Sequence, residues 1–198
     1  MEYQQTYDIV HTFMQHKIYC DKEKVSALHY SKNKQRIQFI EKCIEHLNKH
    51  FLKVETRLNK QDVMQHASKI IQLSKNDDFT NVGLSMNIIR KVLMKNFPEN
   101  KCFWAYQVVF ISWNACVCRK IYENDSELNT TVDYIVQKTI NIVSSEVQNN
   151  GENWNTFLGF PSQGLLIPPS NAFKLTLLVG IVILFAWKIV YKKIRLSS

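Results

Sequence analysis

Three side chains of types that bind metals lie close together in the sequence: Cys43, His46 and His50. On a helix their i, i+3 and i+7 spacing would place the thiol and both imidazoles on one face, as a zinc ion requires. A structural zinc site usually has four ligands, and the sequence offers no convincing fourth. Because Ile44 and Leu47 continue an apolar stripe beside them, the pattern favours a solvated polar flank of an interaction helix over a metal site.

A second pair of thiols, Cys116 and Cys118, could suggest redox chemistry. A helix would turn the two side chains about 200° apart, so disulfide chemistry between them is not expected. The sequence contains no glycine-rich phosphate loop, no nucleophile elbow and no paired carboxylates in an apolar setting. We therefore expect no enzyme, no cofactor and no small-molecule substrate.

The formal charge of +8 raises the question of nucleic-acid binding. Five of the 25 basic residues lie beyond position 172, where no acidic residue occurs, and the rest of the chain is nearly balanced. No segment combines a dense row of Lys and Arg with stacking aromatic residues. The charge therefore suits anionic lipid headgroups near the C-terminal end, and we expect no nucleic-acid partner.

The cysteines and the first residues indicate the compartment. Five cysteines, an odd number without a disulfide-framework spacing, fit a reducing environment. Residues Met1 to Ile18 are amphipathic and include Asp8, so they do not resemble a signal peptide. We expect the body of the protein to face the cytosol.

Hydrophobic periodicity predicts an all-α fold. Apolar residues recur at helical spacing in five segments, which are Tyr7–Ile18, Ile37–Phe51, Asp62–Leu73, a segment capped by Asn81 that ends before Pro98, and Glu127–Gln148. A short aromatic segment, Trp154–Phe160, follows the turn at Asn149-Asn150-Gly151. We place the helical domain at residues 1–160.

The segment Cys102–Cys118 differs from the others because it has no charged residue and is apolar on nearly every side. Its 17 residues are a marginal length for a membrane span. The alternative is a helix surrounded by its neighbours in a bundle. Gln107, Ser112, Asn114 and the two cysteines favour the bundle, and the amphipathic segments supply the surrounding helices.

The C-terminal region predicts a membrane anchor. A linker at 161–173 precedes an apolar helix at 174–191 and a basic tail at 192–198. The span is short, about 25 Å for Leu175–Tyr191, but Lys188 can extend toward the basic end. Since only seven residues follow Tyr191, we expect insertion after synthesis, into the mitochondrial outer membrane rather than the endoplasmic reticulum. The alternative is a core helix docked on the body.

Three segments resemble motifs of the Bcl-2 (B-cell lymphoma 2) family of apoptosis regulators. DIVHTFMQHKI (8–18) is similar to the fourth homology motif, CFWAYQVVFISWN (102–114) to the first, and VQNNGENWNTFLGF (147–160) to the second. Ile44, Leu47 and Phe51 align with the anchors of the third motif, BH3. The order of these segments and the final anchor extend the resemblance over nearly the whole chain.

Two departures bear on function. The family's Gly-Arg pair after the first-motif Trp is replaced by Ala105 and Tyr106, so the Arg that normally pairs with an Asp of the bound helix is missing. The Gly-Asp step of BH3 becomes Asn48-Lys49, which predicts a poor BH3 donor. Such divergence resembles a viral or distant-animal member of the family.

The resemblance implies a Bcl-2-like bundle with a hydrophobic groove that receives the BH3 helix of a pro-apoptotic protein. The groove residues it implies lie on three helices: Ile44, Leu47, Phe51, Ile88, Ile89, Val92, Leu93, Trp104, Ala105, Tyr106, Val108 and Val109. We expect a pro-survival role. The alternatives are a pore former of the same fold, whose Cys102–Cys118 helix enters the membrane, and a tail-anchored adaptor with a closed groove.

Overall fold

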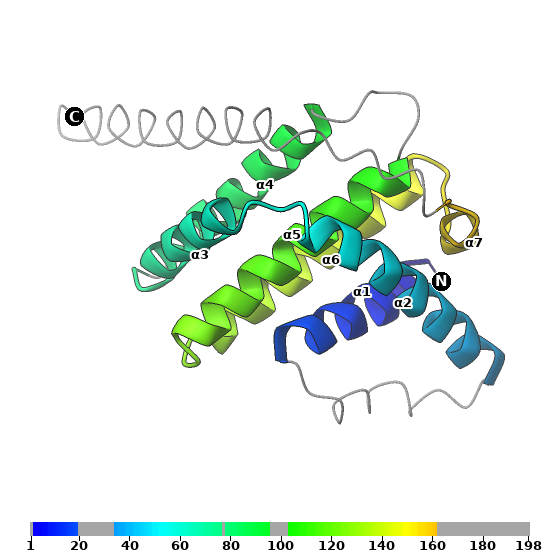
Figure 1. Cartoon of the computed structure of the whole chain (residues 1–198), viewed down its shortest axis with the longest axis horizontal. Coiled ribbons are helices and arrows are strands. Elements are labelled where there is room, and N and C mark those ends of the chain that lie inside the picture. The colour runs from blue at the N-terminus through cyan, green and yellow to red at the C-terminus, as the bar shows by residue number, and fades with distance from the viewer. Residues whose placement is uncertain (1, 20–33, 77, 96–102, 162–198) are drawn as a thin grey trace.

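The computed structural model describes residues 2–19, 34–76, 78–95 and 103–161. All regular structure in these ranges is α-helical, which confirms the predicted fold class (Figure 1). The helices are α1 (Glu2–Tyr19), α2 (Lys34–Glu55), α3 (Lys60–Ser74), α4 (Phe79–Lys95), α5 (Phe103–Asn124), α6 (Asn129–Asn149) and α7 (Trp154–Leu158). They form a bundle, so the coarse prediction of packed helices around one core is correct.

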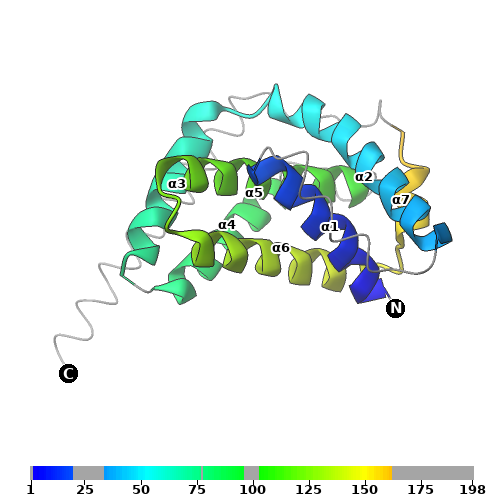
Figure 2. The ribbon, with the colours of Figure 1, turned by 90° about the horizontal axis from the view of Figure 1, so that it is seen from below.

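Helix α5 is the centre of this bundle. Every side chain from Trp104 to Cys118 is buried, and α5 contacts α1, α2, α3, α4 and α6. Helices α5 and α6 run side by side, with α1 and α2 on one side of them and α3 and α4 on the other (Figures 1 and 2). A helix that is apolar all round is stable in water only with such cover. The bundle interpretation of this segment is therefore correct.

Within the described ranges, no helix combines the length and the apolar character that crossing a membrane requires. The predicted anchor at 174–191 and the basic tail at 192–198 lie outside these ranges, as does the linker after Pro161.

The outer helices form because their apolar residues recur on the face that packs inward. In the predicted segment Tyr7–Ile18, which lies in α1, the buried apolar residues are Ile9, Val10, Phe13, Met14 and Ile18. Helix α6 contains many β-branched residues, which favour strands in isolation, yet its buried face is continuous from Val132 to Val147. Burial against α1 and α5 outweighs the local preference.

Helix α4 differs from its predicted form at its start. It begins at Phe79, and the carboxylate of Asp78 accepts a hydrogen bond of 3.2 Å from the backbone N–H of Asn81. The predicted cap at Asn81 is therefore wrong, since Asp78 precedes the helix and fills that role. Leu84, an apolar residue of this helix, is 40% exposed.

The connection from α6 to α7 follows the predicted turn. Gly151 adopts a positive φ of 65°, and its N–H donates to the carbonyl of Gln148. Only glycine takes this conformation without strain, so the helix ends here. Asn153 then caps α7 through a reciprocal pair of hydrogen bonds with Thr156. The turn places α7 across the end of the bundle, against α2.

Candidate functional site

The residues predicted to line a groove are mostly part of the core. Leu47, Leu93, Ala105 and Val109 have no exposed surface. Ten of the twelve are buried, and only Ile44 and Ile88 are half-buried. In this conformation most of them pack against other helices and are covered from solvent.

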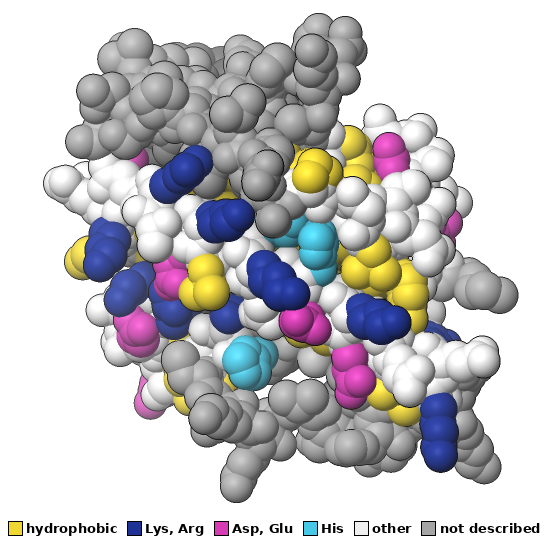
Figure 3. Space-filling model, turned by 45° about the vertical axis from the view of Figure 1, so that its right-hand side comes forward, with side chains coloured by type: hydrophobic (Ala, Val, Ile, Leu, Met, Phe, Trp, Pro, Cys, Tyr) yellow, Lys and Arg dark blue, Asp and Glu magenta, His cyan; other side chains and the backbone are white. Residues whose placement is uncertain are grey.

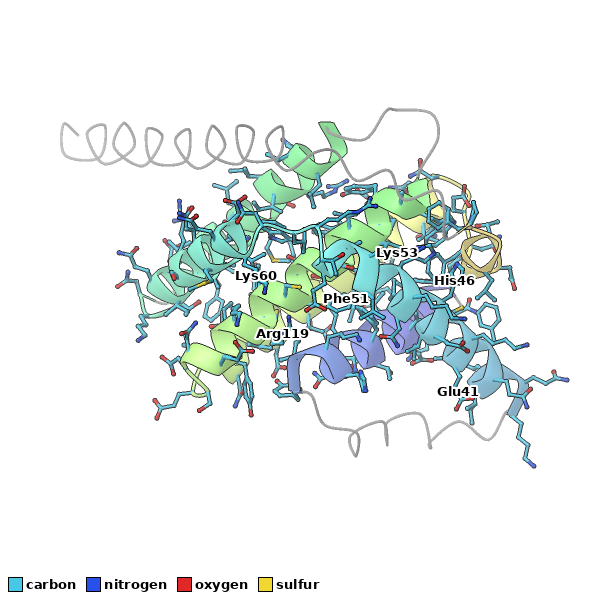
Figure 4. All side chains as sticks on the ribbon, in the orientation of Figure 1. Glu41, His46, Phe51, Lys53, Lys60 and Arg119 are labelled. Carbon is cyan, nitrogen blue, oxygen red and sulfur yellow. The ribbon has the colours of Figure 1, made fainter. Side chains whose placement is uncertain are left out.

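Phe51, one of the predicted groove residues, packs against α1. The Phe51 ring packs edge-on against Phe13 of α1, with ring centroids 5.6 Å apart. The ammonium of Lys17 lies 4.7 Å from the centroid of the same ring. Phe51, labelled on α2 in Figure 4, therefore contacts α1.

Three apolar side chains that the sequence did not single out for binding are exposed. Leu52 of α2 is 59% exposed, Met64 of α3 is 55% exposed, and Leu84 of α4 is 40% exposed. The available signal was that Leu52 and Met64 each interrupt a mostly polar helix face. Figure 3 shows apolar side chains at separate places on one face, with Lys and Arg side chains between them.

Two of the motif-like segments meet through their aromatic residues. The Trp104 ring lies 5.1 Å from that of Trp154 and 5.0 Å from that of Phe157, measured between centroids. The indole N–H of Trp104 also donates to the hydroxyl of Thr156 over 3.0 Å. These contacts fix α7 against the first turn of α5.

A polar cluster lies where α4, α5 and α6 meet. Arg90 forms an ion pair with Glu146, which also accepts a hydrogen bond from the amide of Gln107. Gln107 and Glu146 are both buried, and so is Tyr106. Burial and the nearby Glu146 carboxylate raise the pKa of the Tyr106 phenol, so it stays protonated.

This cluster has unused hydrogen-bonding capacity. The Arg90 guanidinium interacts with the Tyr106 hydroxyl, and Arg90 Nε is buried without a hydrogen-bond partner among the described residues. Both can donate to an acceptor, since the guanidinium and the protonated phenol carry hydrogens. The sequence pattern gives little sign of this role for Arg90, because Lys91 follows it directly in α4.

The sequence expectation for Cys43, His46 and His50 was a solvated polar flank, and this is wrong. Cys43 and His50 have no exposed surface. Burial raises the pKa of the Cys43 thiol to about 12, so it is a neutral side chain at physiological pH. In the part of the chain that the structure describes, no three His, Cys, Asp or Glu side chains gather as a metal site.

The thiols of α5 are equally unsuited to redox chemistry. Burial raises the pKa of Cys116 to about 11 and raises that of Cys118 further. A thiol must ionise to act as a nucleophile or a ligand. Both cysteines therefore act as small apolar residues of the core.

Comparisons with protein-family models, with curated proteins and with solved structures find no match to this chain. Function must therefore be inferred from the residues themselves and from their contacts.

Proposed function

We propose that this protein is a divergent pro-survival regulator of the Bcl-2 type, which binds the BH3 helix of a pro-apoptotic partner. The observation that supports this most is the buried helix α5, enclosed by amphipathic helices. The motif-like segments 102–114 and 147–160 also pack together, through Trp104, Trp154 and Phe157. A predicted anchor at 174–191 would hold the body on the cytosolic side of the mitochondrial outer membrane or the endoplasmic reticulum.

The partner helix would dock on the apolar side chains that α4 leaves accessible. Ile88 is half-buried and Leu84 is more exposed. An amphipathic helix with apolar residues at i, i+3 and i+7 matches such a surface. Binding would also require α4 to move away from α5, because the other predicted groove residues are covered.

Arg90 can supply the positive charge that the segment Trp104-Ala105-Tyr106 lacks. Its guanidinium interacts with Tyr106 and Glu146, and 31% of its side chain is exposed. An acidic residue of the partner helix would accept hydrogen bonds from Arg90 and from the Tyr106 hydroxyl. Such charge-assisted bonds contribute about 1.5–3 kcal/mol each.

Two features support the pro-survival role over a pro-death role. The segment similar to the fourth motif forms α1 and packs on α5 and α6. In α2 the position of the BH3 acidic residue is Lys49, which is exposed and paired with Glu45. A helix with Lys at that position would be a poor ligand for the groove of another family member.

A second candidate is a tail-anchored adaptor with a closed groove. The specific observation in its favour is that ten of the twelve predicted groove residues are buried. Such a protein would show no affinity for BH3 peptides and would use a different surface, so one binding experiment separates the two functions.

The test is a titration of the full chain, in mild detergent, with a panel of fluorescent BH3 peptides. Ile88→Glu and Leu84→Glu place a charge on the proposed surface. A change at the buried Val92 would instead place the charge in the core. Each should lower affinity about tenfold or more, because docking would bury an unpaired carboxylate. Gln137→Glu, at an exposed site on α6, is the matched control.

Two results would contradict the proposal. Absence of binding to every peptide favours the closed-groove adaptor. Faster cytochrome release in cells that express the chain under a death stimulus, together with liposome leakage by the purified protein, favours a pore former.

A further inference from the structure

One side of α4 contacts α6 at two separate places. Phe79, Gly83 and Arg90 lie four and seven residues apart, so they share one face of α4. The Phe79 ring lies 5.3 Å from that of Tyr134, between centroids, and a Cβ at Gly83 would lie 2.7 Å from the Tyr134 hydroxyl. Arg90 forms its ion pair with Glu146, farther along α6. Since 146 − 134 is 12 residues, the two places are about 18 Å apart.

The two contacts differ in kind. At the start of α4 the contact is close packing, and Ser85 is also hydrogen-bonded to the buried His66 of α3 over 3.0 Å. In the C-terminal half the contact is the ion pair, whose Arg90 side chain is 31% exposed and whose Glu146 side chain is 10% exposed. A packed contact has no ligand to exchange, whereas a partly exposed guanidinium can exchange one carboxylate for another. The C-terminal half of α4 is therefore the part that a ligand can release.

Glu146 is held in place without the help of α4. The amide of Gln107, a fully buried residue of α5, donates to Oε2 of Glu146, and the ion pair with Arg90 uses Oε1. The carboxylate thus belongs to the pair α5 and α6, and only the guanidinium comes from α4. Arg90 Nε is buried without a hydrogen-bond partner among the described residues, so Arg90 has donor capacity that Glu146 does not use.

We propose that Glu146 holds the C-terminal half of α4 against α6 by occupying Arg90, and that an acidic residue of a partner helix releases α4 by taking the place of Glu146 on the guanidinium. This inference rests on the proposed function, in which Leu84 and Ile88 of α4 receive the partner. Removing one member of a buried ion pair strands the other charge, but an exchange keeps Arg90 paired, and the departure of α4 exposes Glu146 to water.

The exchange makes Glu146 a residue that determines specificity. A partner helix with Asp or Glu facing Arg90 replaces one ion pair by another. A helix with a neutral residue there would have to break the pair without replacing it, and would bind more weakly. Because only the open form accepts a partner, the apparent affinity falls in proportion to the fraction of molecules in that form. Glu146 lowers this fraction and so excludes helices without an acidic residue.

Hydrogen exchange of the full chain, in mild detergent, tests whether Glu146 holds α4. Glu146→Gln removes the charge and keeps a carbonyl oxygen that can accept from Gln107. Amides of residues 86–93 should exchange about tenfold faster in this variant, since opening no longer breaks a charge-assisted bond, while amides of α1 and α5 keep their wild-type rates. Glu55→Gln is the matched control, because it breaks the ion pair between α2 and Arg119 of α5 and should leave the exchange of α4 unchanged.

Peptide titration of the same proteins tests the exchange of carboxylates. The probes are a BH3 peptide with its Asp and a matched peptide with Asn at that position. Glu146→Gln should bind the Asp peptide about tenfold more tightly than the wild type does, and Glu55→Gln should not. Arg90→Met should bind the Asp and Asn peptides equally, because the group that distinguishes them is gone.

The outcomes separate this inference from the proposed function. Exchange of α4 that is unchanged in Glu146→Gln, or that rises equally in every helix, overturns the inference whatever the peptides do. Equal affinity of Glu146→Gln and wild type for a peptide that binds overturns it as well. If no peptide binds any of the proteins while α4 alone exchanges faster in Glu146→Gln, the proposed function and the role of the partner are overturned, and the role of Glu146 in holding α4 is supported.

Discussion

The indole N–H of Trp113 in α5 donates to Nδ1 of His66 in α3 across 3.0 Å. Because an indole only donates, His66 Nδ1 carries no proton, and Nε2 must donate to the hydroxyl of Ser85 in α4, also 3.0 Å away. His66 is 3% exposed. One neutral ring therefore joins three helices, and since its Nε2 is protonated it cannot act as a base toward Ser85.

The burial of the neutral His66 ring predicts that the stability of the protein falls in mild acid. Burial, with the charge of Lys69, lowers the pKa of His66 to about 4, whereas an unfolded histidine titrates near 6.5. Between these values the unfolded chain binds more protons, so the free energy of unfolding decreases as pH falls from about 6.5 to 4. The loss is at most about 3 kcal/mol for this residue. His50 adds to it in the same direction.

Urea unfolding at a series of pH values between 7.5 and 4.5 measures this loss. His66→Gln should reduce the slope of stability against pH, whatever it does to stability at pH 7.5. His16→Gln should leave the slope unchanged. A slope that is the same in all three proteins would show that His66 is not the titrating group.

The ion pair between Arg90 and Glu146 predicts that mutations of these two residues have coupled effects on the free energy of unfolding. Arg90→Met leaves the Glu146 carboxylate buried without its counter-charge, and should lower the free energy of unfolding by about 2 kcal/mol. Glu146→Gln in that background removes the charge and should restore most of the loss. Tyr106→Phe removes a hydroxyl that interacts with Arg90 but leaves the ion pair in place, so it should cost less than Arg90→Met. Additive effects of the Arg90 and Glu146 changes in denaturant unfolding would contradict this interpretation.

Gly83 allows α4 to approach α6. An added Cβ would lie 2.7 Å from the hydroxyl oxygen of Tyr134, whose ring packs on Phe79. Gly83→Ala should therefore destabilise the wild-type chain despite the better helix propensity of alanine, worth about 1 kcal/mol. In a Tyr134→Phe background the obstructing atom is gone, and the same change should stabilise. Thermal unfolding of the four proteins measures the coupling, and the same sign in both backgrounds would refute it.

The position of α7 depends on a hydrogen bond to α1. The indole N–H of Trp154 donates to the hydroxyl of Thr6 over 3.0 Å, and both residues are buried. Thr6→Val keeps the shape but leaves the indole N–H unpaired, which should cost about 1–3 kcal/mol. Thr6→Ser retains the hydroxyl and should cost less than Thr6→Val. Urea unfolding that ranks the two variants in the opposite order would mean that packing at Thr6 matters more than its hydroxyl.

The sequence was sufficient to predict that the helices exist and that α5 is central, because each of these features depends on a pattern of apolar residues that burial imposes directly. The sequence was less informative about which face of each helix is buried. In α2 the apolar stripe suggested that His50 lay in solvent, but α7 covers the other side of the helix and buries it. Nothing local to α2 carries that information, since the covering residues lie more than a hundred positions later.

The candidate site shows the same limit. A residue that lines a groove and one that fills a core have the same composition, so Leu47, Leu93 and Val109 could be placed on the right helices but not assigned to a surface. The polar cluster around Arg90 escaped prediction for a related reason. Its members come from three helices, and only their packing brings Glu146 beside Gln107.

The enclosure of α5 also sets an order of events during synthesis. Residues Phe103–Asn124 leave the ribosome before α6 and α7 exist, although α6 covers one side of this helix and α7 packs on its first turn. During that interval an uncharged apolar stretch, Phe103–Cys118, is open to chaperones and to neighbouring nascent chains. A chain terminated early within α6 would consequently aggregate or be degraded, and would not survive as a smaller domain.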